Sequence, residues 1–325
     1  MPFRPNWRPS MAIWELPLPP NARVVAAAGA AEPISPTGAA SGGSGHKPGP
    51  GRLPLTASLA GMESGAPIRV GVLGAAGRMG RTACRAVDGA DGLILAAAAD
   101  PAAVGEDLDG VADGIVVVAG PTEVVAAGAE VVVDFTVVDA SRANLPILAE
   151  AGVHAVVGTS GLDGDDLAGL RTSFTSSNCV VVPNFAIGAV LMMRFAEIAA
   201  PWFDTAEVLE FHHDGKIDAP SGTALATADR MAVASTDWVA DRTMTENLSG
   251  GGRGAKGPSD IRIHAVRMRG MVAHQEVVLG TTGQTLTIRH DTIDRDCFMP
   301  GVLLAVRRIA EVPGVTVGLD ALLGL

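Results

Sequence analysis

Short apolar runs alternate with amphipathic stretches from residue 67 to about residue 184. The run IRVGVL at 68–73 is rich in β-branched residues and is bounded by Pro67 and Gly74, as expected of a buried strand. Similar runs follow at 93–99, 115–119, 131–136, 154–160 and 179–184, and stretches with helical spacing separate them, notably 78–90, 138–151 and 163–173. Continuously apolar strands that alternate with helices predict a Rossmann-type α/β fold, a doubly wound parallel sheet with both faces covered.

The pattern changes after about residue 185. A long apolar helix at 188–203 is followed by a strand at 206–213 and a helix at about 222–235. A glycine-rich loop at 249–258 then leads to three strands of alternating polarity, at 261–268, 273–280 and 285–291. Consecutive alternating strands predict a second, α+β domain with a mostly antiparallel sheet that is covered by helices on one face.

The first 66 residues differ from the rest in composition. They hold 11 of the 21 prolines and low-complexity pieces such as GAASGGSGHKPGPG, which predicts a disordered extension. One alternative is that translation begins at Met62, a few residues before the first strand. A signal peptide is the other alternative, with Arg4 and Arg8 ahead of VVAAAGAA, although that apolar stretch is short and Glu15 and several prolines interrupt its approach.

Composition excludes several classes of protein. The 325 residues are enough for two domains and a tail, and the formal charge of −11 argues against a nucleic-acid partner. No apolar run approaches the roughly 18 residues that a membrane helix needs, so we expect no membrane partner. Cys84, Cys179 and Cys297 are scattered without CxxC spacing, which argues against a disulfide framework or a zinc site and favours a reducing, cytoplasmic setting.

A glycine motif directly follows the first predicted strand. In GVLGAAGRMG, Gly74, Gly77 and Gly80 have GxxGxxG spacing at the start of a predicted helix. Glycine permits unusual φ angles and a close approach of the backbone to a pyrophosphate, and the helix N-terminus offers free N–H groups to that anion. The motif alone is weak evidence, because such loops also serve helix–strand packing. Its position nevertheless predicts dinucleotide binding.

An aspartate strengthens this interpretation and bears on the choice of cofactor. Asp100 ends the second predicted strand, 20 residues after Gly80, where a carboxylate can accept hydrogen bonds from ribose hydroxyls. It would repel a 2′-phosphate, so NADH is favoured over NADPH. Arg78 is the counter-argument, since its side chain could reach such a phosphate or contact the pyrophosphate instead.

Several motifs in order along the chain carry a resemblance to one family. GAAGRMG, VVVDFT, VVGTSG, PNFAIG and EFHHDGKIDAPSGTA together resemble the 4-hydroxy-tetrahydrodipicolinate reductase (dihydrodipicolinate reductase) family of lysine and diaminopimelate biosynthesis. The similarity runs from about residue 68 to the C-terminus, and the HHxxK…DAPSGTA run is highly specific. The family comparison implies reduction of 4-hydroxy-2,3,4,5-tetrahydrodipicolinate to tetrahydrodipicolinate by NADH or NADPH, and a homotetramer.

The resemblance also implies roles for single residues. The proton donors would be His212 and Lys216, and the substrate would contact His213, Gly222 and Thr223. The cofactor would contact Gly74, Ala75, Ala76, Gly77, Arg78, Met79, Asp100, Gly158, Thr159, Ser160, Val182, Pro183, Asn184 and Phe185. Three positions depart from the family pattern: Ser160 replaces the usual threonine, Val182 the usual alanine, and Ala76 stands where some relatives carry lysine.

Elementary chemistry supports the same site. A cyclic dicarboxylate imine needs cations for its carboxylates and a proton source near the ring, and an imidazole has an unperturbed pKa near neutrality. PSGT precedes a predicted helix, so Ser221 or a neighbour can cap it while the next N–H groups face an anion. Taken without the family, either histidine could equally be a satisfied core residue, Lys216 a solvated loop residue, and Asp218 a brace for the turn. A zinc site is disfavoured because His212 and His213 lack i, i+4 spacing.

These observations predict three parts of the chain: the extension at 1–66, a dinucleotide-binding domain at 67–184 that is completed by 297–325, and a substrate-binding and oligomerisation domain at 185–296. Two other functions stay open. One is a different two-domain dehydrogenase. A semialdehyde dehydrogenase would need a reactive cysteine, and a sugar dehydrogenase commonly has a Lys–His pair in another context; neither pattern is evident. The other is a dinucleotide-sensing module that binds NADH without turnover.

Overall fold

The structure is a computed structural model that describes residues 66–108, 110–239 and 252–325. All of them belong to one unit of the chain, Ala60–Leu325. The predicted disordered extension lies outside the described residues except for residue 66, and so does the beginning of the glycine-rich loop, 249–251.

A six-stranded parallel sheet forms from the apolar runs of the first half of the chain. Its strands lie in the order β11–β5–β4–β3–β1–β2. The bounds are Ile68–Leu73 for β1, Leu93–Ala99 for β2, Val131–Asp134 for β3, His154–Val157 for β4, Cys179–Val181 for β5 and Val315–Val317 for β11. The chain order reverses between β1 and β3, and ligands of open α/β sheets bind at the carboxyl edge of such a reversal.

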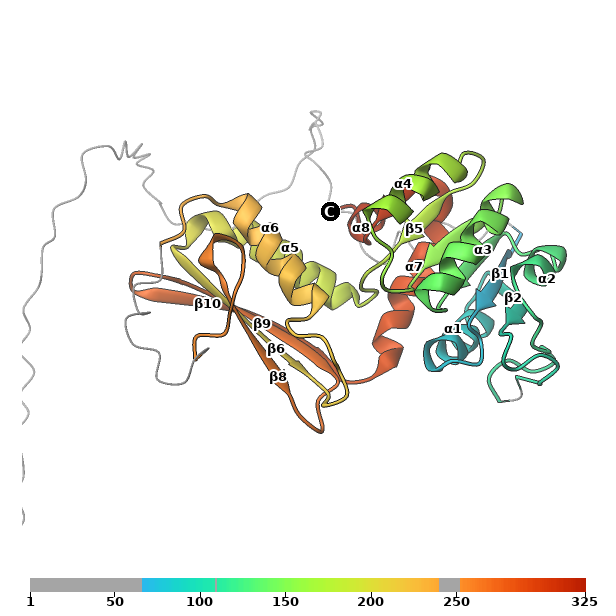
Figure 1. The fold of residues 1–325 in the computed structure, drawn as a ribbon, viewed down its shortest axis with the longest axis horizontal. Coiled ribbons are helices and arrows are strands. Elements are labelled where there is room, and N and C mark those ends of the chain that lie inside the picture. Colours follow the sequence, from blue (N-terminus) through green and yellow to red (C-terminus); the bar gives the residue numbers. More distant parts are fainter. Residues whose placement is uncertain (1–65, 109, 240–251) are drawn as a thin grey trace, which may run out of the picture. The chain divides into compact units, whose positions relative to one another are not determined.

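Helices cover both faces of this sheet (Figure 1), as predicted for a doubly wound fold. Helices α1 (Arg78–Asp88) and α7 (Met299–Arg308) pack with one core cluster. Helices α2 (Pro121–Ala126), α3 (Val138–Glu150) and α4 (Gly164–Ser173) pack with the other. The last helix of the chain, α8, spans Asp320–Leu323. Both β11 and α7 thus return the C-terminal segment to the first sheet.

One predicted strand of this half is wrong. The run at 115–119 makes only isolated bridges, from Val116 to Asp107 and from Val118 to Ala99. Most of its backbone hydrogen bonds go to the preceding loop, for example from Val117 N to Glu106 O at 2.9 Å. An apolar run can therefore find its partner in its own loop, and the run then adds no strand to the sheet.

The second sheet has five strands in the order β10–β9–β6–β8–β7. The bounds are Thr205–His212 for β6, Ala255–Lys256 for β7, Arg262–Arg267 for β8, Ala273–Thr281 for β9 and Gln284–Thr292 for β10. Most neighbours pair antiparallel, as predicted, but β6 and β8 are parallel. Strands β8 and β9 follow one another in the chain but are not neighbours in the sheet, because β6 lies between them and pairs with both.

Helices α5 (Ile187–Ala199) and α6 (Gly222–Ala234) lie along one face of this second sheet (Figure 1). Short 3₁₀ helices also occur at Ala200–Trp202, Pro258–Asp260, Arg295–Phe298 and Ile309–Glu311. On β6, the buried positions Ala206, Val208 and Glu210 alternate with half-buried ones, so a carboxylate occupies an inward position of the strand. No helix among the described residues has both the length and the apolar character needed to cross a bilayer.

Candidate active site

The glycine loop after β1 has the backbone geometry that a close approach to phosphates requires. Gly74 has φ +77°, and a Cβ added at Gly80 would lie 2.7 Å from the carbonyl carbon of Gly74 and still nearer its oxygen. Gly77 is the N-cap of α1, and no side chain caps the helix. The first-turn N–H groups of α1 are therefore free of a side-chain acceptor, and the loop fits an anionic diphosphate.

Asp100, the residue predicted to bind the ribose, lies beside the glycine loop. Its carboxylate accepts hydrogen bonds from Ala76 N at 3.1 Å and from Ala102 N at 3.0 Å. The carboxylate thus ties the end of β2 to the glycine loop. The ribose contact itself stays a prediction.

Two aromatic rings close over the turn after β4. Phe135 and Phe185 meet edge to face at 5.7 Å between centroids, and Gly158 lies against both rings. Beneath them, the buried carboxylate of Asp134 accepts hydrogen bonds from the hydroxyl of Ser141 at 2.7 Å and from that of Thr159 at 3.2 Å. This network fixes the loops that follow β3 and β4, and with them the predicted nicotinamide turn at 158–160.

A cavity of about 260 Å³ joins residues of both sheets. From the predicted site it is lined by Met79, Gly158, Val182, Pro183, Asn184, Phe185, His212 and Thr223. Further lining residues, which were not predicted as part of the site, include Phe135, Ser221, His274, Gln275, His290 and Phe298. One space therefore brings together predicted cofactor residues, the predicted proton donor and a predicted substrate residue.

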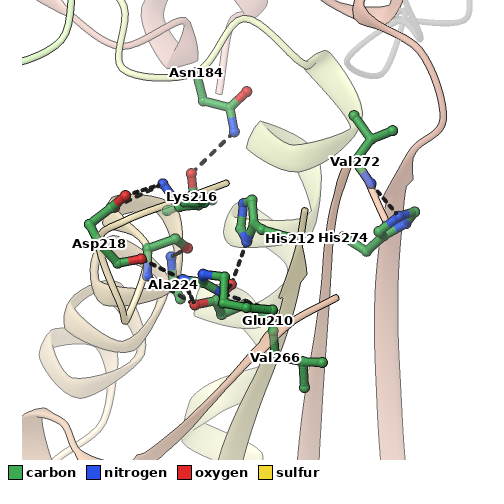
Figure 2. Close-up of polar contacts among 12 residues, drawn as sticks. Asn184, Glu210, His212, Lys216, Asp218, Ala224, Val266, Val272 and His274 are labelled. Carbon is green, nitrogen blue, oxygen red and sulfur yellow. Dashed lines mark hydrogen bonds and ion pairs between the residues drawn. The ribbon is translucent and has the colours of Figure 1, made fainter. Parts of the chain in front are cut away.

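His212 stands at the end of β6 with only 15% of its side chain exposed. Its Nδ1 pairs with Oε2 of Glu210, whose side chain is fully buried (Figure 2). The carboxylate is an acceptor, so Nδ1 is the donor and Nε2 is left for the cavity. The adjacent His213 is exposed and does not line the cavity, so the two neighbouring histidines have different surroundings.

Burial lowers the pKa of His212 because desolvation disfavours the imidazolium, and the hydrogen bond and charge of Glu210 oppose this shift. The nearby cations Lys216 and Arg267 also lower the pKa. For Glu210, burial raises the pKa, but the hydrogen bonds from Arg267 and His212 outweigh burial and the net shift is downward. Glu210 is therefore ionised at neutral pH, and the net shift of the His212 pKa is downward, with burial as its largest cause.

Lys216 is tied to a carboxylate of its own loop. Its Nζ lies 2.7 and 2.8 Å from the two oxygens of Asp218, which is half exposed (Figure 2). Lys216 is not among the cavity-lining residues. Because Asp218 is half exposed, the pair can separate at little net cost, since such surface ion pairs contribute ~0–1 kcal/mol.

Helix α6 begins beside the cavity. The hydroxyl of Ser221 caps it by accepting from Ala224 N at 3.3 Å, as predicted for the PSGT segment. Gly222 and Thr223 form the first turn, and Thr223 Oγ1 accepts a hydrogen bond from Asn184 Nδ2 at 3.2 Å (Figure 2). A predicted cofactor residue and a predicted substrate residue are thus in direct contact.

Sequence reasoning missed several residues of the site, of which Glu210 and Arg267 matter most. Arg267, on β8, donates to both oxygens of Glu210 at 2.8 Å. An acidic residue at an inward position of β6 was a signal that could have been used, because buried carboxylates need partners. No comparable signal marked Arg267. Within residues 66–108, 110–239 and 252–325, no cluster of three His, Cys, Asp or Glu side chains is suited to a metal ion.

Comparisons with known proteins agree with this geometry. Family models described as dihydrodipicolinate reductase, N-terminus and C-terminus, match residues 68–185 and 188–323. The chain is 49% identical over 263 residues to the 4-hydroxy-tetrahydrodipicolinate reductase of Nocardia farcinica, and 48% identical over 265 residues to that of Beutenbergia cavernae. Each of these alignments covers 79% of this chain and 99% of the relative.

Solved structures give the same result. A dipicolinate-bound dihydrodipicolinate reductase from Paenisporosarcina sp. TG-14 aligns with a TM-score of 0.69 at 34% identity, over 78% of this chain and 99% of that one. An amine dehydrogenase from Mycobacterium smegmatis shares the fold with a TM-score of 0.54, at 14% identity. The two family models cover most of the described residues, and the chain belongs to the dihydrodipicolinate reductase family.

Proposed function

We propose that this chain reduces 4-hydroxy-2,3,4,5-tetrahydrodipicolinate to tetrahydrodipicolinate in lysine and diaminopimelate biosynthesis. The reaction consumes one NAD(P)H and one proton and releases water and NAD(P)⁺. The supporting observation is that His212, Thr223 and Asn184 line the same cavity as Gly158 and Phe185. Membership of the family supplies the substrate class.

The cofactor supplies the hydride when it is bound. The glycine loop and the N-terminus of α1 would hold its diphosphate, Asp100 its ribose, and the turn 158–160 with Asn184 the nicotinamide. The uncapped start of α1 is the feature of this chain that fits such a ligand, and the lack of room for a Cβ at Gly80 shows that this helix start packs closely against Gly74. Phe135 and Phe185 would give that end of the cavity an apolar wall.

The substrate's two carboxylates would meet positive groups on the other side of the cavity. The first-turn N–H groups of α6, at Gly222 and Thr223, face an anion with the positive end of the helix dipole. Lys216, and His213 at the rim, would take the second carboxylate once Asp218 releases the ammonium group. Binding a dianion also raises the pKa of His212, because the added negative charge favours the imidazolium.

His212 would then act as the proton donor. The 4-hydroxy substrate first loses water to give the conjugated carbon–nitrogen system. Hydride addition to that system leaves an enamine, which must be protonated, and a positioned acid contributes about 10²–10⁴-fold to the rate. The Nε2 atom faces the cavity because Nδ1 is held by Glu210. We assign Lys216 to orienting the substrate or relaying the proton.

Finer features of this proposal follow the same reasoning. NADH is favoured over NADPH because Asp100 places negative charge where a 2′-phosphate would lie. The proposed assembly is a cytoplasmic homotetramer, with residues 185–296 as the substrate-binding and oligomerisation domain and residues 67–184 with 297–325 as the dinucleotide-binding domain.

A coupled assay tests the proposal. A synthase forms the unstable hydroxy-imine from aspartate semialdehyde and pyruvate in the cuvette, and the loss of reduced-nicotinamide absorbance is followed. We expect turnover by the wild type, and kcat reduced by about 10²-fold or more in His212→Gln and Lys216→Ala with NADH binding intact. Saturable NADH binding without oxidation would instead make the chain a dinucleotide sensor, and normal kcat in a variant would remove that residue from proton transfer.

A further inference from the structure

Four hydrogen-bond donors converge on one buried carboxylate beneath the cavity. Glu210 accepts from Nη1 and Nη2 of Arg267, both at 2.8 Å, from Nδ1 of His212, and from the backbone N–H of Ser221 at 3.1 Å. Its side chain is fully buried. Each of its oxygens therefore has two donors, one from the Arg267 guanidinium and one from either His212 or Ser221.

We propose that Glu210, clamped by Arg267, is the positioning residue of the reaction: it orients the His212 ring, and with Arg267 it anchors the far end of the loop that carries Lys216. The kinetic part of this inference rests on the proposed function. Glu210 and Arg267 do not line the cavity, so neither is assigned contact with the substrate.

The orientation of His212 follows from the chemistry of the acceptor. An ionised carboxylate can only accept, so Nδ1 of the neutral ring carries the proton and Nε2 faces the cavity. A carboxylate at Nδ1 also stabilises the imidazolium when Nε2 is protonated, as the aspartate does for the histidine of serine-protease triads. Without Glu210, the ring could turn or change tautomer, and its proton would no longer be held toward the cavity.

The loop is anchored through the same pair. Residues 213–221 leave the end of β6 and return at the start of α6, and Lys216 lies within them. Near their return, Arg267 Nη2 donates to the carbonyl of Asp218 at 2.6 Å, and Ser221 N donates to Glu210. A single ion pair thus holds the imidazole, the loop and the beginning of α6 in register.

A purely structural role is the competing explanation, because a buried ion pair that loses one partner destabilises a protein whatever its position. The two explanations differ in the pH dependence of kcat. The charged or titratable groups around His212 are Glu210 on β6, Lys216 in the loop and Arg267 on β8, with His274 and His290 lining the same cavity from β9 and β10. Of these, Glu210 favours the imidazolium of His212, whereas Lys216 and Arg267 disfavour it.

The first test is Glu210→Gln, which keeps the size of the side chain and removes its charge. We expect kcat to fall by about 10²-fold or more. We also expect the alkaline limb of the plot of kcat against pH to move to lower pH by about one unit or more, because the negative charge beside His212 is gone. A fall in kcat with an unmoved alkaline limb would overturn the proposal in favour of a structural role, and so would kcat within threefold of wild type.

Arg267→Lys separates the two anchored parts, and it still decides the matter if Glu210→Gln does not fold. Lysine keeps the charge beside Glu210 but loses the fork that also reaches Asp218. We expect KM for the substrate to rise about tenfold while kcat stays within about threefold and the alkaline limb stays in place. A matched control is Arg142→Lys, because Arg142 makes a similar two-pronged pair with Asp166 at 2.9 Å on α3 and α4. Its kinetics should not change, and an Arg267→Lys variant that behaves like this control would overturn the loop assignment.

A readout without turnover separates failure of this inference from failure of the proposed function. In ¹⁵N-histidine NMR spectra of the wild type, the His212 signal, identified by its loss in His212→Gln, should report a proton on Nδ1 of the neutral ring. In Glu210→Gln this tautomer signature should change and the titration should move to lower pH. An unchanged signal overturns the positioning role, whereas the expected change in a protein that proves inactive in the coupled assay overturns only the proposed reaction.

Discussion

Gly158 sits at a point of the site where the structure leaves no room for a side chain. A Cβ built on Gly158 would lie 2.6 Å from Cδ1 of Phe135, nearer still to Cε1 of that ring, and 2.9 Å from Cε2 of Phe185. Contacts between carbon atoms are optimal at about 3.5–4.0 Å. In Gly158→Ala, the ring of Phe135 must therefore move by about 1 Å or more, or the turn 158–160 must move by that distance.

This displacement has two measurable costs. Overpacking of a filled site costs about 1–3 kcal/mol of the free energy of unfolding. For a domain of this size, each kcal/mol lowers the melting temperature by about 2–4 °C. The rings and the turn line the cavity, and a displacement of about 1 Å from the productive geometry can cost about 10²-fold in rate, so we expect kcat/KM to fall by that order.

Urea denaturation and the coupled assay measure both effects. The matched control is Gly169→Ala in α4, because nothing lies within 4 Å of a Cβ added there. The control replaces a glycine in an exposed helix interior and should stabilise the protein by about 0.5–1 kcal/mol without loss of activity. If Gly158→Ala unfolds at the wild-type urea concentration and keeps its kcat/KM, the packing of this turn against the two rings is not as described.

Three further predictions concern other parts of the chain. Asp100→Ala should raise the ratio of kcat/KM with NADPH to kcat/KM with NADH by about tenfold, equivalent to ~1.4 kcal/mol. The reason is that the substitution removes the negative charge proposed to face the 2′ position of the ribose. An unchanged ratio would contradict the assigned ribose contact. Cys297 should react with a thiol reagent in the native protein at pH 8 well before Cys84 and Cys179. Burial raises the pKa of those two buried thiols to about 12, whereas Cys297 is only partly buried, although burial raises its pKa as well. Mass spectrometry of the labelled protein decides, and rapid native labelling of either buried thiol would oppose the prediction. Burial lowers the pKa of His154, whose Nδ1 accepts a hydrogen bond from Asn178 N at 2.9 Å, so the unfolded chain binds more protons and stability is lost as the pH falls below about 6.5. The urea midpoints at pH 7.5 and pH 5.5 should therefore differ less in His154→Gln than in the wild type. An equal difference would argue against His154 as the source of this pH dependence.

The parallel sheet was predictable because its strands are continuously apolar, and such runs have few other places in a protein. Periodicity does not, however, identify the partner of a run. Residues 115–119 satisfy their backbone by pairing mainly with the loop before them, which a pattern of apolar residues cannot reveal. The insertion of β6 between β8 and β9 is likewise a property of the tertiary structure, since alternation reports only which face of a strand is buried.

The candidate site was predictable where a motif carries its chemistry in one segment, as with the glycine loop and the capped start of α6. It was not predictable where the chemistry depends on contacts between strands. Glu210 could have been noticed as a charge at an inward position of β6. Arg267 lies 57 residues away and reaches Glu210 only because β6 and β8 are neighbours. The pairing of Lys216 with Asp218 likewise appears only in the structure.

Isotope labels show whether the substrate ring receives its hydride from the cofactor and whether its reduction depends on His212. The wild-type protein is given freshly formed hydroxy-imine and nicotinamide cofactor deuterated at the transferable C4 position, and the product is analysed by mass spectrometry. We expect tetrahydrodipicolinate carrying one carbon-bound deuterium from the cofactor, and we expect His212→Gln to form it more slowly by about 10²-fold or more. Product without cofactor-derived deuterium, or undiminished labelling rates in His212→Gln, would contradict this expectation.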